Sequence, residues 1–86
     1  MITKKDHHAE WALLMYELDD AKDHLETLMR EMTEDAEFAE EDYRVQLGHI
    51  FSHLNRAWNM RDRLGTDWTD EQFQKFSRFP QDLAPI

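Results

Sequence analysis

Between residues 11 and 32, apolar side chains recur at alternating steps of three and four. This is the heptad spacing of a helix that packs along another helix, with its seam at the a and d positions, and it does not fit a strand, which alternates every second residue. Extended beyond Met32, the same frame places only charged or imidazole side chains at the d positions, so one straight helix cannot continue. The first seam consists of Trp11, Leu14, Leu18, Ala21, Leu25, Leu28 and Met32.

A second apolar frame starts at Tyr43. The change of phase predicts two helices, over residues 6–32 and 35–64, and the tight turn between them makes them antiparallel neighbours. Thr33 is the expected N-cap of the second helix, and Gly65 is expected directly after its end. The second seam consists of Tyr43, Leu47, Ile50, Leu54, Ala57 and Leu64.

A third helix is predicted by its capping residues. Thr69 and Gln72 stand three apart, as in a capping box, in which each side chain bonds the other residue's backbone N–H. Trp68 and Phe73 flank them at the spacing of a hydrophobic staple. These residues predict a short helix over residues 70–78.

The last residues, 79–86, are expected to form an extended tail, because Pro80 disfavours helical geometry in the residue before it. Only two glycines and two prolines punctuate the chain, β-branched runs are nearly absent, and nothing repeats. We therefore expect a single all-α domain over residues 1–86.

Composition excludes several classes of protein. The chain has no cysteine, so it has neither disulfides nor thiol chemistry. Its 19 acidic residues against 10 basic ones leave a net charge of −9, which argues against binding nucleic acid or an anionic membrane. No stretch approaches the ~18 apolar residues of a membrane span, and the start of the chain does not read as a signal peptide. We expect a cytoplasmic protein.

The two edges of the predicted hairpin differ. In an antiparallel pair the e positions line one edge, which is mostly apolar here, and the g positions line the other, which is polar. The third helix is too short to cover two long helices, so a second copy is expected to complete a four-helix bundle as a homodimer. The alternative is a monomeric three-helix fold whose third helix and tail cover the apolar edge. The expected interface residues are Met15, Met29, Phe51 and Trp58.

Two pairs of polar residues have the spacing of metal ligands. Asp20 and His24 are four apart, as are His49 and His53, so each pair lies on one helix face. With a tight turn, the first pair lies opposite residues 43–47, about one turn from His49. The pattern leaves two alternatives open: a site for a divalent metal between the helices, or a solvated polar edge with no metal and no cofactor.

The outer face of the second helix carries the one basic patch of this acidic chain. Arginine and asparagine side chains can grip carboxylates or phosphates in fixed geometry, although most such stripes are solvated helix faces. The patch is a candidate docking site for an anion or an acidic partner. We call it the arginine stripe, and its residues are His49, Ser52, Arg56, Asn59 and Arg63.

No motif pairs a nucleophile with a base or cradles a phosphate, so the sequence does not predict an enzyme. The favoured function is that of a small acidic interaction or structural protein that self-associates through its apolar helix edge. One alternative is a divalent-metal-binding bundle that uses the polar-edge histidines. A second is an acidic inhibitor of a basic partner, in the manner of an immunity protein or an antitoxin.

Overall fold

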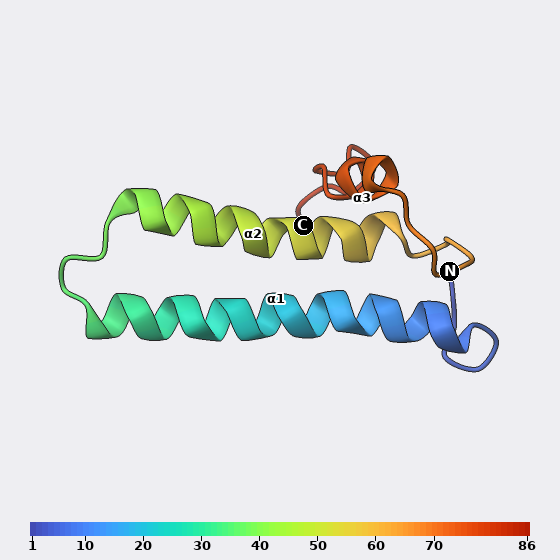
Figure 1. Ribbon diagram of the computed structural model, residues 1–86, viewed down its shortest axis with the longest axis horizontal. Coiled ribbons are helices and arrows are strands. Elements are labelled where there is room, and N and C mark those ends of the chain that lie inside the picture. The colour runs from blue at the N-terminus through green and yellow to red at the C-terminus, as the bar shows by residue number, and fades with distance from the viewer.

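Three helices and no strand make up the fold. The computed structural model describes all residues from 1 to 86, with α1 at His8–Glu34, α2 at Glu40–Asn59 and α3 at Asp70–Phe76 (Figure 1). The first two helices lie side by side and antiparallel, and α3 packs on the side of α2 away from α1. The prediction of an all-α fold with a helical hairpin is thus confirmed. No helix is both long enough and apolar enough to cross a membrane.

The turn between the long helices lies later in the chain than predicted. Thr33 is not an N-cap: it belongs to α1, where its hydroxyl donates to the backbone oxygen of Met29 at 2.7 Å. This bond, four residues back along the helix, is the alternative that a threonine hydroxyl has to capping. The segment 35–39 makes the turn, and the N-cap of α2 is Ala39.

The second long helix ends earlier than predicted, at Asn59 rather than near residue 64. Just after this end, the backbone N–H of Ile2 donates to the oxygen of Arg61 at 2.7 Å, which joins the N-terminal segment to the chain. Gly65, expected directly after the helix, lies beyond this turn with a φ of 91°. That left-handed conformation suits glycine, and it aims the Gly65 N–H at the carboxylate of Glu10, 2.9 Å away.

Seven apolar residues are buried, and six of them form two small core clusters. One cluster closes the end of the hairpin near the N-terminus, and the other lies towards the turn. In α1 the buried positions are the d positions of the heptad, whereas the a positions Leu18, Leu25 and Met32 remain 40–44% exposed. The hairpin therefore closes on half of its seam. The clusters are Ile2, Leu14 and Met60, and Ala21, Leu28 and Ile50.

The start of α3 is as predicted. Thr69 Oγ1 accepts from the Gln72 N–H at 3.1 Å, and Gln72 Oε1 accepts from the Thr69 N–H at 3.0 Å, which completes the capping box. The staple is present as well, with the rings of Trp68 and Phe73 6.3 Å apart. The helix stops at Phe76 rather than at residue 78.

Candidate functional site

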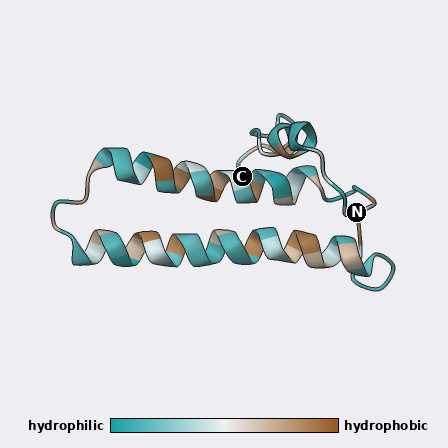
Figure 2. Cartoon of the chain, in the orientation of Figure 1, coloured by the Kyte–Doolittle hydropathy of each residue, from teal (hydrophilic) through white to brown (hydrophobic).

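The predicted apolar edge is divided between two environments. Phe51 and Trp58 on α2 lie under the C-terminal tail, where the rings of Phe51 and Phe79 are 5.2 Å apart. Met15 and Met29 on α1 remain exposed, and the tail does not reach them. The alternative in which the tail covers the edge is thus realised over part of α2 only. Figure 2 shows apolar segments alternating with hydrophilic ones along both long helices.

On one side of the hairpin, large apolar side chains stay at least 40% exposed, including Phe51 and Leu54 beside the tail. Leu18 and Leu54, both at a positions, line the same groove between α1 and α2, which shows that the a positions of the two helices share one side. The e positions flank them on that side. We call this surface the apolar face, and its exposed residues are Met15, Leu18, Leu25, Met29, Met32, Phe51 and Leu54.

One carboxylate of the tail accepts two hydrogen bonds from α2 and the residues just after it. Asp82 accepts from the indole Nε1–H of Trp58 at 2.9 Å and from Arg61 Nη2 at 3.2 Å. Arg61 also lies over the Trp58 ring, 3.8 Å from its centroid. The hydrogen bond from Trp58, followed by those from the backbone and Arg61, lowers the pKa of Asp82 below its ordinary 3.8.

This lowered pKa predicts how the tail responds to acid. A carboxyl with a lowered folded-state pKa contributes stability that is present above its unfolded pKa and is lost as the pH falls through the folded one. We expect the Trp58–Asp82 bond to persist at pH 3.8 and to break only below it. The indole Nε1 proton shift of Trp58, followed by NMR against pH, measures this, with Asp82→Asn as the control that lacks the transition. A transition above pH 3.8 would contradict the assignment.

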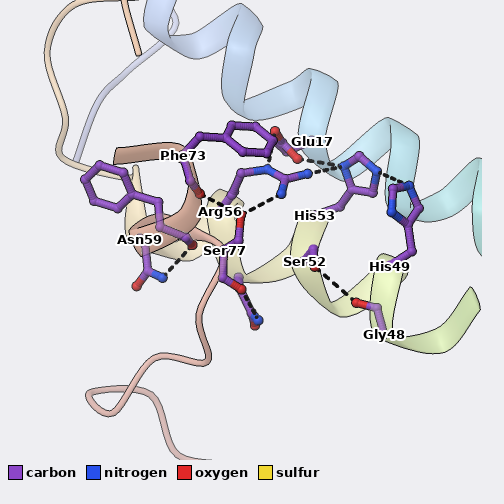
Figure 3. Close-up of polar contacts among 11 residues, drawn as sticks. Glu17, Gly48, His49, Ser52, His53, Arg56, Asn59, Phe73 and Ser77 are labelled. Carbon is purple, nitrogen blue, oxygen red and sulfur yellow. Dashed lines mark hydrogen bonds and ion pairs between the residues drawn. The ribbon is translucent and has the colours of Figure 1, made fainter. Parts of the chain in front are cut away.

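A buried ionic network joins the three helices beneath α3 (Figure 3). Arg56, only 5% exposed, donates from Nε to Glu17 Oε1 on α1 at 2.8 Å and from Nη1 to the hydroxyl of Ser77 at 2.8 Å. Its guanidinium also lies 4.2 Å from the ring centroid of Phe73. The other carboxylate oxygen, Glu17 Oε2, is 2.7 Å from His53 Nδ1. One arginine on α2 therefore fixes both neighbouring helices.

Most of the arginine stripe is occupied by the chain itself. Besides Arg56, Asn59 is bound to the end of α3, since its Nδ2 donates to the backbone oxygens of Phe76 and Arg78 at 2.8 and 3.0 Å. Arg63 lies over the ring of Trp68 at 4.3 Å. Sequence reasoning placed these side chains on an outer face, but the chain after residue 65 returns to cover them. Ser52, which donates to the Gly48 oxygen at 3.2 Å, and His49 are the remaining members.

Three of the histidines meet at the polar edge of the hairpin. The ring of His24 on α1 is 4.5 Å from that of His49 and 5.3 Å from that of His53, centroid to centroid. The nearest nitrogens, Nε2 of His49 and Nε2 of His53, are 3.1 Å apart. His53 is buried, while the other two are exposed. We call these three residues the histidine cluster.

The longer turn explains why these rings meet. Because residues 35–39 form the turn, the register shifts, and His24 lies opposite His49 and His53 rather than opposite 43–47. The spacing in the sequence predicted correctly that these histidines share one edge, but the predicted register between the two helices was wrong. Asp20, the fourth candidate ligand, is not part of the cluster but is near enough to act on the charge of His49.

The surroundings of His49 favour its neutral form. Its pKa is lowered from 6.5, first because neighbouring groups displace water from the ring, and then because His53, His24 and Arg56 place positive charge beside it. Asp20 acts in the opposite direction. A neutral imidazole keeps one nitrogen lone pair free to accept a hydrogen bond or to bind a metal.

No family model matches this chain, and the comparisons with curated proteins and with solved structures find no match either. Its function therefore has to be inferred from the apolar face and from the polar groups opposite it.

Proposed function

We propose that this protein is a non-catalytic interaction protein that self-associates through the apolar face, two copies forming a four-helix bundle. The observation that carries the proposal is that only part of the heptad seam is buried. In α1 the a-position side chains Leu18, Leu25 and Met32 stay 40–44% exposed beside buried d positions. Seam residues of a helical bundle are normally packed against a neighbouring helix.

The small size of the core favours a second copy of the chain as the partner that covers the apolar face. Seven buried apolar residues in 86 are few, and small domains of this size commonly gain stability by association. The apolar face offers at least seven further large apolar side chains on the same side of the hairpin. A twofold axis would place this self-complementary face against its copy, so each side chain contributes twice.

Charge is arranged in keeping with self-association. Two copies of a chain with net charge −9 repel each other unless the acids stay outside the interface. The e positions of the two helices carry no acid, and the two charged residues among them are Lys22 and Arg44. Asp19, Asp20 and Asp23 lie just outside, in a hollow that Met15 also lines. The rim of one copy can therefore pair with the opposite charge on the other.

Leu25→Glu tests this proposal by sedimentation equilibrium. We expect the unaltered protein to be dimeric in the micromolar range, and the variant to dissociate with a Kd raised by more than about 100-fold, because a twofold interface would bury two unpaired carboxylates. Val45→Glu is the matched control. Val45 is 62% exposed on α2 but lies outside the apolar face, so its Kd should be unchanged.

Circular dichroism of both variants separates loss of association from loss of folding. If the unaltered protein is a strict monomer at the highest micromolar concentrations, self-association is wrong. It is equally wrong if Val45→Glu dissociates the protein as strongly as Leu25→Glu does.

A further inference from the structure

The histidine cluster has the geometry of a metal site. Zinc in proteins is bound tetrahedrally at about 2.0–2.1 Å from each imidazole nitrogen, which places two ligand nitrogens about 3.3 Å apart. The Nε2 atoms of His49 and His53 are already 3.1 Å apart. A ligand nitrogen of His24 lies within 4.8 Å of both, so a small side-chain rotation at this exposed residue completes a three-nitrogen set.

The helices hold two of the ligands in place before any metal arrives. His49 and His53 are one turn apart on α2, with centroids 4.7 Å apart, so the backbone itself fixes their separation. His24 comes from the facing helix α1. A site shared between two packed helices costs little ordering entropy on binding, because the hairpin has already brought the ligands together.

Glu17 supplies the outer contact that a metal-binding histidine needs. Its Oε2 lies 2.7 Å from His53 Nδ1, and a carboxylate at this position keeps the proton on Nδ1 and leaves the Nε2 lone pair free. Arg56 Nη2 is 3.0 Å from the same nitrogen and can donate to it only in the tautomer that has its proton on Nε2. A metal on Nε2 selects the tautomer with its proton on Nδ1, and in that tautomer His53 Nδ1 and Arg56 Nε both donate to Glu17.

We propose that His24, His49 and His53 bind a divalent transition metal, with Zn²⁺ as the best fit. Imidazole donors suit zinc, copper and nickel more than magnesium or calcium, which prefer oxygen. Three histidines leave a fourth position for water or for the nearby carboxylate of Asp20. The metal can be reached from solvent, because two of the three rings are exposed.

The metal site and the apolar face lie on opposite edges of the hairpin. The histidines His24 and His53 occupy g positions, whereas the apolar face is built from a and e positions. Metal binding is therefore independent of self-association. One metal per chain is expected both in a dimer and in a dissociated variant such as Leu25→Glu, so failure of one proposal leaves the other standing.

The test is a Zn²⁺ titration of protein purified without a histidine tag, followed by calorimetry and by the melting temperature. We expect one Zn²⁺ per chain and a Tm that rises with Zn²⁺ concentration, because a ligand that binds the folded state stabilises it. His49→Ala and His24→Ala each remove a ligand, and each should raise the Kd for Zn²⁺ more than about 100-fold. Glu17→Gln removes only an outer contact and should raise the Kd by about 10–100-fold.

His8→Ala is the matched control, since it removes a histidine outside the cluster and should leave the Kd unchanged. Co²⁺ provides a second readout, because its visible spectrum reports tetrahedral nitrogen ligation directly in the unaltered protein. Absence of bound Zn²⁺ with an unchanged Tm would overturn the proposal. So would a Kd that His8→Ala raises as much as His49→Ala does, since binding would then be non-specific.

Discussion

Replacing Glu17 by alanine is expected to lower the free energy of unfolding by about 3–5 kcal/mol, the range for breaking a buried ion pair by removing one partner. The loss is large because Arg56 stays behind. Its side chain is 6% exposed, and Glu17 is its one carboxylate partner. A guanidinium cannot lose its proton to escape burial, so the variant has to bury an unpaired charge or undock α3 to expose it.

Urea denaturation followed by circular dichroism measures this loss. Domains of this length are stabilised by roughly 4–13 kcal/mol in total, so Glu17→Ala should move the midpoint far toward zero urea. Glu41→Ala is the control: it breaks the exposed pair with Arg44 and should cost no more than about 1 kcal/mol.

A double variant separates the cost of losing the ion pair from the cost of burying an unpaired arginine. Glu17→Met combined with Arg56→Met removes both charges, and we expect it to be more stable than Glu17→Ala alone, as is usual when a buried pair is replaced by apolar side chains. If Glu17→Ala lowers the free energy of unfolding no more than Glu41→Ala does, Arg56 finds water or another partner, and the network does not hold α3 in place.

The network around Arg56 could not be predicted from the sequence, whereas the hairpin could. The heptad spacing identified the hairpin and the residues at its d positions, because local periodicity and helix geometry determine which face is apolar. In the second frame, however, Arg56 lies at an outward position, and it is buried between Glu17 on α1 and the chain that returns through α3. That return depends on contacts distant in the sequence, such as Asn55 Nδ2 donating to the Ser77 oxygen at 2.9 Å. Periodicity carries no information about such contacts.

The histidine cluster was predictable in part for the same reason. The i,i+4 spacing of His49 and His53 placed both on one face, and the antiparallel hairpin brought His24 to the same edge. The register between the helices depended on the turn. Thr33 belongs to α1, and the turn at 35–39 brings different residues level.

Leu28→Ala is the second large effect we expect, with a loss of about 2–5 kcal/mol of unfolding free energy. Leu28 is 2% exposed and packs with Ala21 and Ile50 in the core cluster nearer the turn. The cost combines lost burial with a cavity, and a cluster with only three buried members has few neighbours that can move in to fill it.

Leu25→Ala, three residues earlier on α1, is the informative comparison, because Leu25 is 43% exposed on the apolar face. In a monomer its removal costs much less than that of Leu28, since less of its surface is buried. In a dimer built on the apolar face, a second copy buries the remainder, so the cost of Leu25→Ala grows with protein concentration while the dimer forms. Thermal melts of both variants at several concentrations measure the two costs. A concentration-independent cost for Leu25→Ala would mean that no second copy covers this side chain, whereas Leu28→Ala should be severely destabilised in monomer and dimer alike.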